Sequence, residues 1–230
     1  METPLLALAA LGLFGVFAVA RVVYADLLSP EARVKRSLVR RPRVAIARAP
    51  DGVVRITGRV RAGGALLVAP VTQRPCVAYQ LVIEGDEQGS WGSVLELQDA
   101  RPFTLVDQTG EAFVDVADRS FLLALVPDKR GWTRSDADQD ASTQAVRLLL
   151  RSAHVAIDGM FDGPRRFRYR EAALVEGRRV AVGGQGTREV TPDGARPSVR
   201  EPPQRYVVRG SADEPLLISD LREALGQSGE

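Results

Sequence analysis

Hydrophobic and polar positions divide the chain into an apolar beginning and a long region of short apolar runs. Residues 4–20 carry no charge, and the apolar pattern resumes after Arg21 and continues to residue 28. An apolar helix of about 20 residues is long enough to cross the hydrocarbon of a bilayer. Arg21 can extend to the headgroups, and Tyr24 suits the membrane interface. The pattern predicts a transmembrane anchor over residues 1–28.

A cleaved signal peptide is the alternative for this segment, because "AVA" at residues 18–20 resembles a small-residue cleavage site. The residues before the apolar run contain Glu2 and no Lys or Arg. The run is also longer than the apolar part of a typical signal peptide. These features favour an anchor that is not cleaved.

Basic residues gather directly after the apolar segment: Arg33, Lys35, Arg36, Arg40, Arg41 and Arg43. Positive charge collects on the cytoplasmic side of membrane helices, so we expect a single-pass protein of the cell (inner) membrane with its large domain in the cytoplasm. Residues 29–48 are interpreted as a basic juxtamembrane linker. Through residues 33–48 the chain either lies on anionic lipids or has a solvated connection that only sets the topology.

Residues 49–230 have the pattern of one β-rich domain. Short β-branched runs such as "VVRITGRV", "CVAYQLVIEG" and "RYVVRG" are separated by turn residues. Residues 102–116 are typical of a hairpin that turns at 107–110. Helical spacing over 141–153 predicts a helix capped by Asp140 or Ser142, and 219–227 a second, short helix. The predicted fold is α+β, mainly antiparallel β, barrel- or sandwich-like, with one or two helices and a flexible loop at 185–203.

The composition excludes several kinds of structural and binding site. The chain has 230 residues with 31 Lys and Arg, 29 Asp and Glu, one Cys and one His. A net charge of +2 does not indicate nucleic-acid binding. One Cys and one His exclude an internal disulfide framework and a Cys/His zinc module. Cys76 is predicted to be a buried core residue, and His154 a structural or surface residue.

Three local patterns are weak candidates for a site. Asp136, Asp138 and Asp140 begin like a calcium loop, but the sixth and twelfth positions hold Ala and Arg instead of Gly and Glu. "VGGQG" at 182–186 lacks the third glycine and the helix of a dinucleotide fingerprint. The remaining pattern is an alternation on one possible strand, with Arg166, Arg168 and Arg170 on one face and Phe167 and Tyr169 on the other. It fits phosphate or nucleic-acid binding, and it fits better a wet arginine face over an aromatic core face. We therefore assign no catalytic residue, cofactor or metal, and no nucleic-acid partner.

Four blocks in order resemble the GIDE domain, also called BAM for "beside a membrane". The matching positions are 58–60, 66–70, 74–77 and 79; 102–103, 107, 109–110 and 114–115; 171, 174, 177, 180, 182 and 184; and, more weakly, 215–220. This family occurs in mitochondrial membrane-bound ubiquitin ligases and in bacterial and archaeal membrane proteins. The resemblance implies a β-rich domain next to a bilayer and a structural role for the Pro75–Cys76 pair.

The resemblance also implies an E3 ubiquitin ligase activity, which in the eukaryotic relatives is carried by a second transmembrane helix and a zinc-binding RING. The sequence contains neither, and Cys76 and His154 cannot supply the RING's ligands. We expect a non-enzymatic binding or sensing module with an unidentified protein partner or lipid. The alternatives are a ubiquitin-protein transferase, a hydrolase with an unrecognised site, and a self-associating membrane scaffold.

Overall fold

The computed structural model describes residues 30–87, 89–118, 120–134, 140–157, 165–190 and 204–226. Their helices are α2 (Pro30–Arg40), the 3-10 helix η1 (Ile46–Arg48) and α3 (Ala141–Ser152). Their strands are β1 (Arg43–Val44), β2 (Gly52–Ala62), β3 (Leu67–Val68), β4 (Pro75–Cys76), β5 (Ala78–Glu87), β6 (Ser90–Ala100), β7 (Phe103–Val106), β8 (Glu111–Asp115), β9 (Phe121–Ala124), β10 (Lys129–Arg134), β11 (Arg166–Leu174), β12 (Arg179–Val190), β13 (Gln204–Arg209) and β14 (Leu216–Ser219).

Five strands close into a small barrel in the order β2, β7, β8, β13 and β12, and β12 pairs back to β2. β2 serves both neighbours because it is long: residues 52–59 pair with β12 and residues 59–62 with β7. At Gly58, where the three strands meet, a Cβ atom would lie 2.5 Å from the Val106 carbonyl oxygen. A side chain there would push β7 away, so glycine permits the closure.

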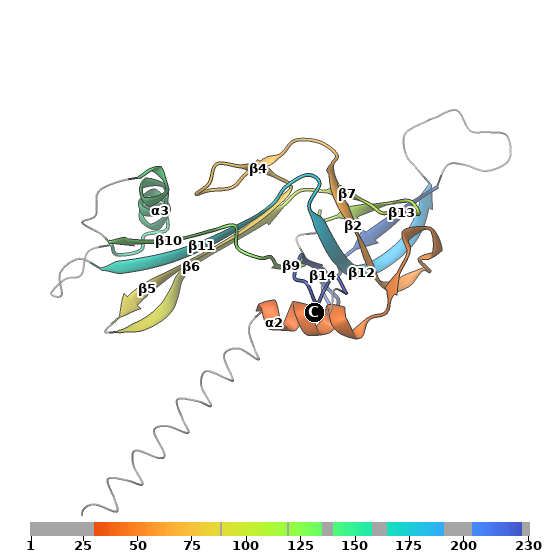
Figure 1. Cartoon of the computed structure of the whole chain (residues 1–230), viewed down its shortest axis with the longest axis horizontal. Coiled ribbons are helices and arrows are strands. Elements are labelled where there is room, and N and C mark those ends of the chain that lie inside the picture. Colours follow the sequence, from red (N-terminus) through yellow and green to blue (C-terminus); the bar gives the residue numbers. More distant parts are fainter. Residues whose placement is uncertain are drawn as a thin grey trace, which may run out of the picture.

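A second sheet of four strands, in the order β10, β11, β5 and β6, extends from the barrel (Figure 1). β5 and β11 join the two bodies, since each contributes residues to the barrel core at one end and to a second core at the other. The second core lies between this sheet and α3, where Val146 and Leu150 pack with Leu81, Ile83 and Phe167. The periodic apolar face of α3 therefore covers one face of the four-stranded sheet.

The predicted fold class is confirmed in its main features. The described chain is mainly β, with mostly antiparallel pairs, a closed barrel and two α-helices. The hairpin at 102–116 forms as β7 and β8, and Asp140 caps α3 by accepting a hydrogen bond from the Thr143 backbone N–H at 2.7 Å. The second predicted helix is absent from the described part of 219–227, where residues 222–226 form a turn.

Residues 30–48 differ from the predicted linker. They form α2, β1 and η1, and α2 buries Val34 and Leu38 against a cluster that includes Ala181 and Leu217. The two apolar side chains lie four residues apart and so share one helix face, which lets a basic segment pack as an amphipathic helix.

Two other predicted segments fall partly or wholly outside the described residues. Of the loop predicted at 185–203, residues 185–190 belong to β12 and pair with β13, and 191–203 lie outside. The predicted anchor over 1–28 also lies outside. Among the helices that are described, none has the length and apolar character to span a membrane.

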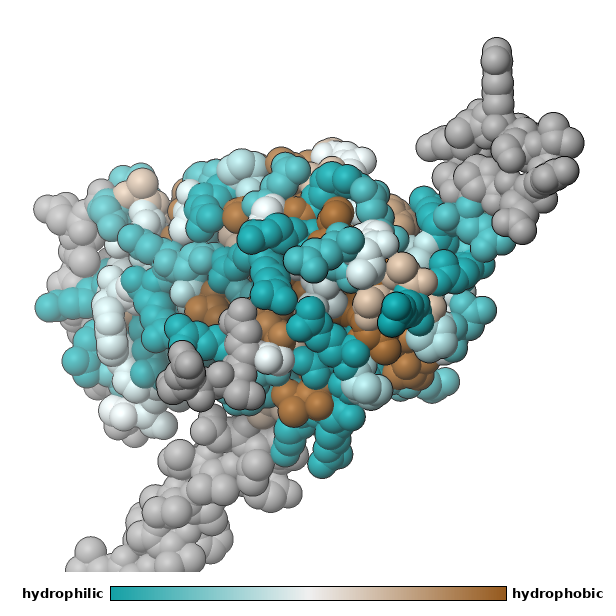
Figure 2. All heavy atoms as spheres, turned by 45° about the vertical axis from the view of Figure 1, so that its right-hand side comes forward, coloured by the Kyte–Doolittle hydropathy of each residue, from teal (hydrophilic) through white to brown (hydrophobic). Residues whose placement is uncertain are grey.

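Hydrophilic side chains cover most of the face seen in Figure 2, and hydrophobic residues appear there in separate groups. Exposed large hydrophobic residues are few in the described chain, and Trp132 is the most exposed of them, at 68%. Scattered apolar residues are normal on a soluble surface, but an exposed tryptophan is a marker of binding surfaces.

Candidate functional site: an arginine and tryptophan face

The four-stranded sheet has one apolar face and one polar face because its side chains alternate. On β11, Phe167 and Tyr169 are buried in the core under α3, while the arginines between them point the other way. Register then places Trp132 of β10 and Glu84 of β5 on either side of Arg168. We define the arginine–tryptophan face by six residues: Trp91, Arg130, Trp132, Arg166, Arg168 and Arg170.

Arg168 is at the centre of this face. Its guanidinium forms two hydrogen bonds with the Glu84 carboxylate, Nε to Oε2 at 2.5 Å and Nη2 to Oε1 at 3.1 Å. These bonds raise the pKa of Arg168 above its usual value. The same guanidinium lies over the Trp91 ring, 4.7 Å from its centroid. The carboxylate and the indole together hold Arg168 in one orientation.

The two tryptophans support each other. The Trp91 and Trp132 ring centroids are 5.1 Å apart and the rings are nearly perpendicular, an edge-to-face arrangement. Trp132 nevertheless keeps most of its surface in solvent. It is therefore fixed in position without being part of the core.

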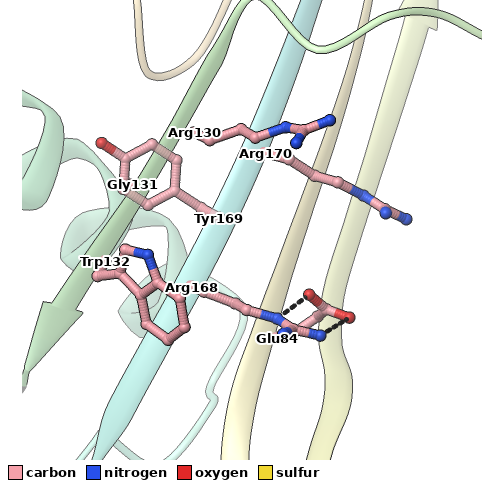
Figure 3. Close-up of a pocket in the computed structure, with 7 residues that line it drawn as sticks. All are labelled: Glu84, Arg130, Gly131, Trp132, Arg168, Tyr169 and Arg170. Carbon is pink, nitrogen blue, oxygen red and sulfur yellow. Dashed lines mark hydrogen bonds and ion pairs between the residues drawn. The ribbon is translucent and has the colours of Figure 1, made fainter.

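Two more arginines flank the centre. Arg166 pairs with Asp86 at 2.5 Å, and Arg170 lies 3.4 Å from a carboxylate oxygen of Glu31 in the first turn of α2. In Figure 3 the side chains of Arg130, Arg168 and Arg170 extend in one direction across the strands, and the Tyr169 ring extends in the other direction, beside Gly131. Glu84, Trp132 and these arginines line an open pocket of about 400 Å³.

The chemistry available on this face is anion binding and stacking. Guanidinium groups donate paired hydrogen bonds to phosphate or carboxylate, and indoles contact apolar or cationic groups. The face contains no nucleophile beside a general base. Within the described ranges, no group of three or more His, Cys, Asp or Glu residues is placed to hold a metal ion.

Cys76 and His154 are placed away from such chemistry. Cys76 is fully buried beside Ala69 and Ala173, and burial, with the nearby Glu171 carboxylate, raises the pKa of its thiol to about 11. This confirms the predicted core role, since a reactive cysteine needs an accessible thiolate. His154 is exposed and ends α3 with a positive φ of 55°. Its N–H donates to the Arg151 carbonyl oxygen, and the Val155 N–H to that of Leu150, which forms a Schellman motif.

The structure also gives the positions of the other candidate motifs from the sequence. Asp140 is the α3 cap, while Asp136 and Asp138 lie outside the described residues. Residues 182–186 are in the middle of β12, paired with β2 on one side and with β14 and β13 on the other, so they form no phosphate loop. The alternation on β11 has the predicted arrangement of wet arginines over an aromatic core.

Three residues of the face, Trp91, Arg130 and Trp132, were outside the sequence prediction, and so was Glu84, which holds Arg168. Trp91 and Trp132 lie on β6 and β10, two strands whose polar composition hides their β pattern. "KRGWTR" at 129–134 does alternate around Gly131 and Thr133, and that alternation is the signal available in the sequence.

A second polar cluster joins α2 to the barrel. Arg55 on β2 is 5% exposed and donates to the carbonyl oxygens of Leu38 at 3.0 Å, Arg41 at 3.3 Å and Ala224 at 2.6 Å. Burial, and then the charge of Arg43, lower the pKa of Arg55. Leu38 and Arg41 lie at the C-terminal end of α2, where carbonyl oxygens lack the usual helical partners. The Leu38 carbonyl oxygen also accepts from the Arg41 N–H at 3.2 Å, so Arg55 is a second donor to it and adds to the capping of this helix end.

Ion pairs reinforce this junction. Lys35 pairs with Glu223 at 2.6 Å, and Arg41 pairs with Glu214. Lys35 and Arg41, two of the basic residues for which the sequence left lipid contact or solvent open, are thus engaged with carboxylates of the domain.

No family model matches the chain, and no similar curated protein or solved structure was found.

Proposed function

We propose that this chain is a single-pass, membrane-anchored, non-enzymatic interaction module, with a GIDE-type barrel domain that recognises a partner beside the bilayer. The observation that carries the proposal is the docking of α2. This helix begins at Pro30, directly after the predicted anchor, and is packed into the barrel domain through buried Val34 and Leu38.

The docking fixes the distance between domain and membrane. A free linker over 29–48 would reach about 70 Å when extended, whereas a single residue between anchor and helix spans at most about 3.6 Å. Arg55 and the two ion pairs hold the C-terminal half of α2 on the barrel domain. A binding surface held so close to the bilayer meets membrane-bound partners at a high effective concentration.

The arrangement of the resembling blocks supports a GIDE-type domain. Residues 58–60 of the first block and residues 180–184 of the third fall on β2 and β12, which pair with each other and close the barrel. Within the first block, 66–70 and 74–77 face each other across the β3 and β4 pair, with Cys76 opposite Leu67. Positions far apart in the sequence thus belong to one hydrogen-bonded unit.

Membrane attachment is tested with the full chain in cells. We expect it to stay in the membrane pellet after alkaline carbonate extraction, and a variant lacking residues 4–28 to be released. A reporter fused after Glu230 should be active on the cytoplasmic side, as the flanking arginines predict. Release of the intact full chain by carbonate would refute the anchor, and a reporter active only outside the cytoplasm would refute the orientation.

The interaction role is tested by loosening the attachment. A Gly/Ser insert of about 20 residues between residues 29 and 30 adds a mean reach of about 25 Å. In cells where loss of the gene gives a measurable defect, the insert should reproduce it, and the Cys76→Ala and His154→Ala variants should not. Function that survives the insert but is lost in both alanine variants would favour an enzyme.

Cross-linking in intact cells separates the remaining alternatives. A cross-linked product with a second protein is expected for a binding module, and a ladder of the chain with itself for a scaffold.

A further inference from the structure

The arginine–tryptophan face is uncovered in the described structure, whereas the opposite face of the same sheet is covered by α3. Trp132 exposes 68% of its surface although Trp91 packs edge-to-face against it. An indole that is fixed in position and left mostly in water gains only a part of its burial energy within this chain. The arrangement indicates a surface that binds another molecule and buries the Trp132 ring against it.

The position of this face relative to the anchor comes from Glu31. Its carboxylate lies 3.4 Å from Arg170 Nη2, so the first turn of α2 is against the face. Pro30, the first residue of α2, follows the predicted anchor after one residue. If residue 28 lies at the bilayer surface, then Arg170, through its contact with Glu31, is separated from the headgroups by only the few residues between 28 and 31.

The chemistry of the face matches that surface. Arginine makes paired hydrogen bonds with phosphate, and tryptophan is enriched where bilayer and water meet. Arg130 and Arg170 are neighbours across β10 and β11 and extend to the same side (Figure 3). Arg130 forms no ion pair with any residue that the structure describes, and Arg170 is held by one longer contact to Glu31.

We propose that this face docks on the anionic phospholipid surface of the membrane in which the chain is anchored. Arg130 and Arg170 bind headgroup phosphates, and Trp132 enters the interfacial region. Arg166 and Arg168 are held in short ion pairs by Asp86 and Glu84, whereas the contact of Arg170 with Glu31 is longer and leaves its guanidinium more available to a phosphate. The role of Arg166 and Arg168 is to hold the surface and the indole in place. The inference rests on the anchor of the proposed function.

The experiment uses the full chain carrying Trp91→Phe, so that Trp132 is the sole tryptophan, in nanodiscs whose lipids carry brominated acyl chains. Bromine quenches indole fluorescence at close range. We expect the quenched fraction in discs of phosphatidylcholine with phosphatidylglycerol to be at least twice that in phosphatidylcholine alone. The excess should decline as NaCl is raised, because salt screens surface charge.

Arg130→Gln combined with Arg170→Gln should remove the excess quenching. Each arginine near an anionic surface contributes about fivefold, so the double variant should lower the ratio of docked to undocked domain roughly 25-fold. Arg59→Gln with Arg61→Gln on β2 removes the same charge from another surface and should leave the quenching unchanged. Arg130→Gln alone, an exposed position, serves if the double variant loses its circular dichroism spectrum, and should lower the ratio about fivefold.

The outcomes separate this inference from the anchor. A chain that fails to co-elute with nanodiscs overturns both. A chain that co-elutes but is quenched equally in neutral and anionic discs keeps the anchor and overturns lipid docking. Lipid docking is also overturned if the two double variants behave alike, and the face would then be assigned to a protein partner.

Discussion

The role of Arg55 leads to the most specific stability prediction. Arg55→Met replaces the guanidinium with an unbranched apolar side chain that can occupy much of the same space. The carbonyl oxygens of Leu38, Arg41 and Ala224 then lose the guanidinium as a donor, and Leu38 keeps only the longer bond from the Arg41 N–H. Two of these carbonyls are at the end of α2 and the third is in the C-terminal turn, so the change acts on the junction that joins α2 to the barrel.

The size of the effect follows from the contacts. A hydrogen bond to a charged group contributes about 1.5 to 3 kcal/mol, and the bonds to Leu38 and Ala224 have good lengths. The substitution also removes a buried charge that has no carboxylate partner among the contacts above. Because burying such a charge is costly, its removal offsets part of the decrease in the free energy of unfolding. We expect a net decrease of about 3 kcal/mol in the free energy of unfolding.

The assay is urea unfolding of the full chain in a mild detergent, followed by circular dichroism, together with limited trypsin digestion. Trypsin should cleave the variant within residues 33–41 well before the rest of the domain. The matched control is Arg61→Met on the same strand, whose pair with Glu111 is about half exposed and contributes at most about 1 kcal/mol. Equal stability of the two variants, with α2 still protected, would show that Arg55 does not hold the junction.

Three further predictions concern single side chains. Partial burial opposes ionisation of Asp107, but hydrogen bonds from Thr109, Ile46 and Gly110 outweigh it and lower its pKa. The stabilisation by the ionised carboxylate is therefore complete above the unfolded pKa of about 3.9 and is lost as pH falls through the folded pKa. Asp107→Asn should lower the free energy of unfolding, measured in urea, by about 1 to 2 kcal/mol at pH 7 and by little at pH 2.5. An equal decrease at both pH values would contradict this. His154→Gly should raise stability by about 0.5 to 1 kcal/mol, because it removes a left-handed conformation from a residue with a Cβ; a drop in the unfolding midpoint would refute the assignment. Cys76 should resist iodoacetamide at pH 8 until urea unfolds the domain, as mass spectrometry would show, and rapid native labelling would mean that the thiol is accessible.

The sequence predicted the parts of the fold whose signal is local. β-Branched runs identified β2, β5 and β13, and the turn residues around Asp107 and Gly110 identified the hairpin. The spacing of Val146 and Leu150 identified α3. Each of these depends on residues within one element, where periodicity and turn chemistry act directly.

The missed features depend on distant partners. Val53 on β2 pairs with Gln185 on β12, and because the two lie far apart in the chain, closure of the barrel through these strands has no local signal. β6 and β10 are the outer strands of their sheet and carry many polar residues, which obscures the alternation. In residues 30–48 the positive charge is typical of a linker, but Val34 and Leu38 have helical spacing, and their partners Ala181 and Leu217 are far away in the sequence.

The two proposals meet in α2. This helix packs on the barrel through Arg55 and Leu38, and its first turn touches the four-stranded sheet through Glu31 and Arg170. In the proposed membrane-anchored arrangement, the orientation of α2 on the barrel therefore decides which face of the sheet is turned toward the bilayer. Arg55 lies on a different strand and sheet from the arginine–tryptophan face, so Arg55→Met leaves that face intact. If α2 sets the orientation, the same substitution should still reduce quenching of Trp132 in anionic nanodiscs, whereas Arg61→Met should not.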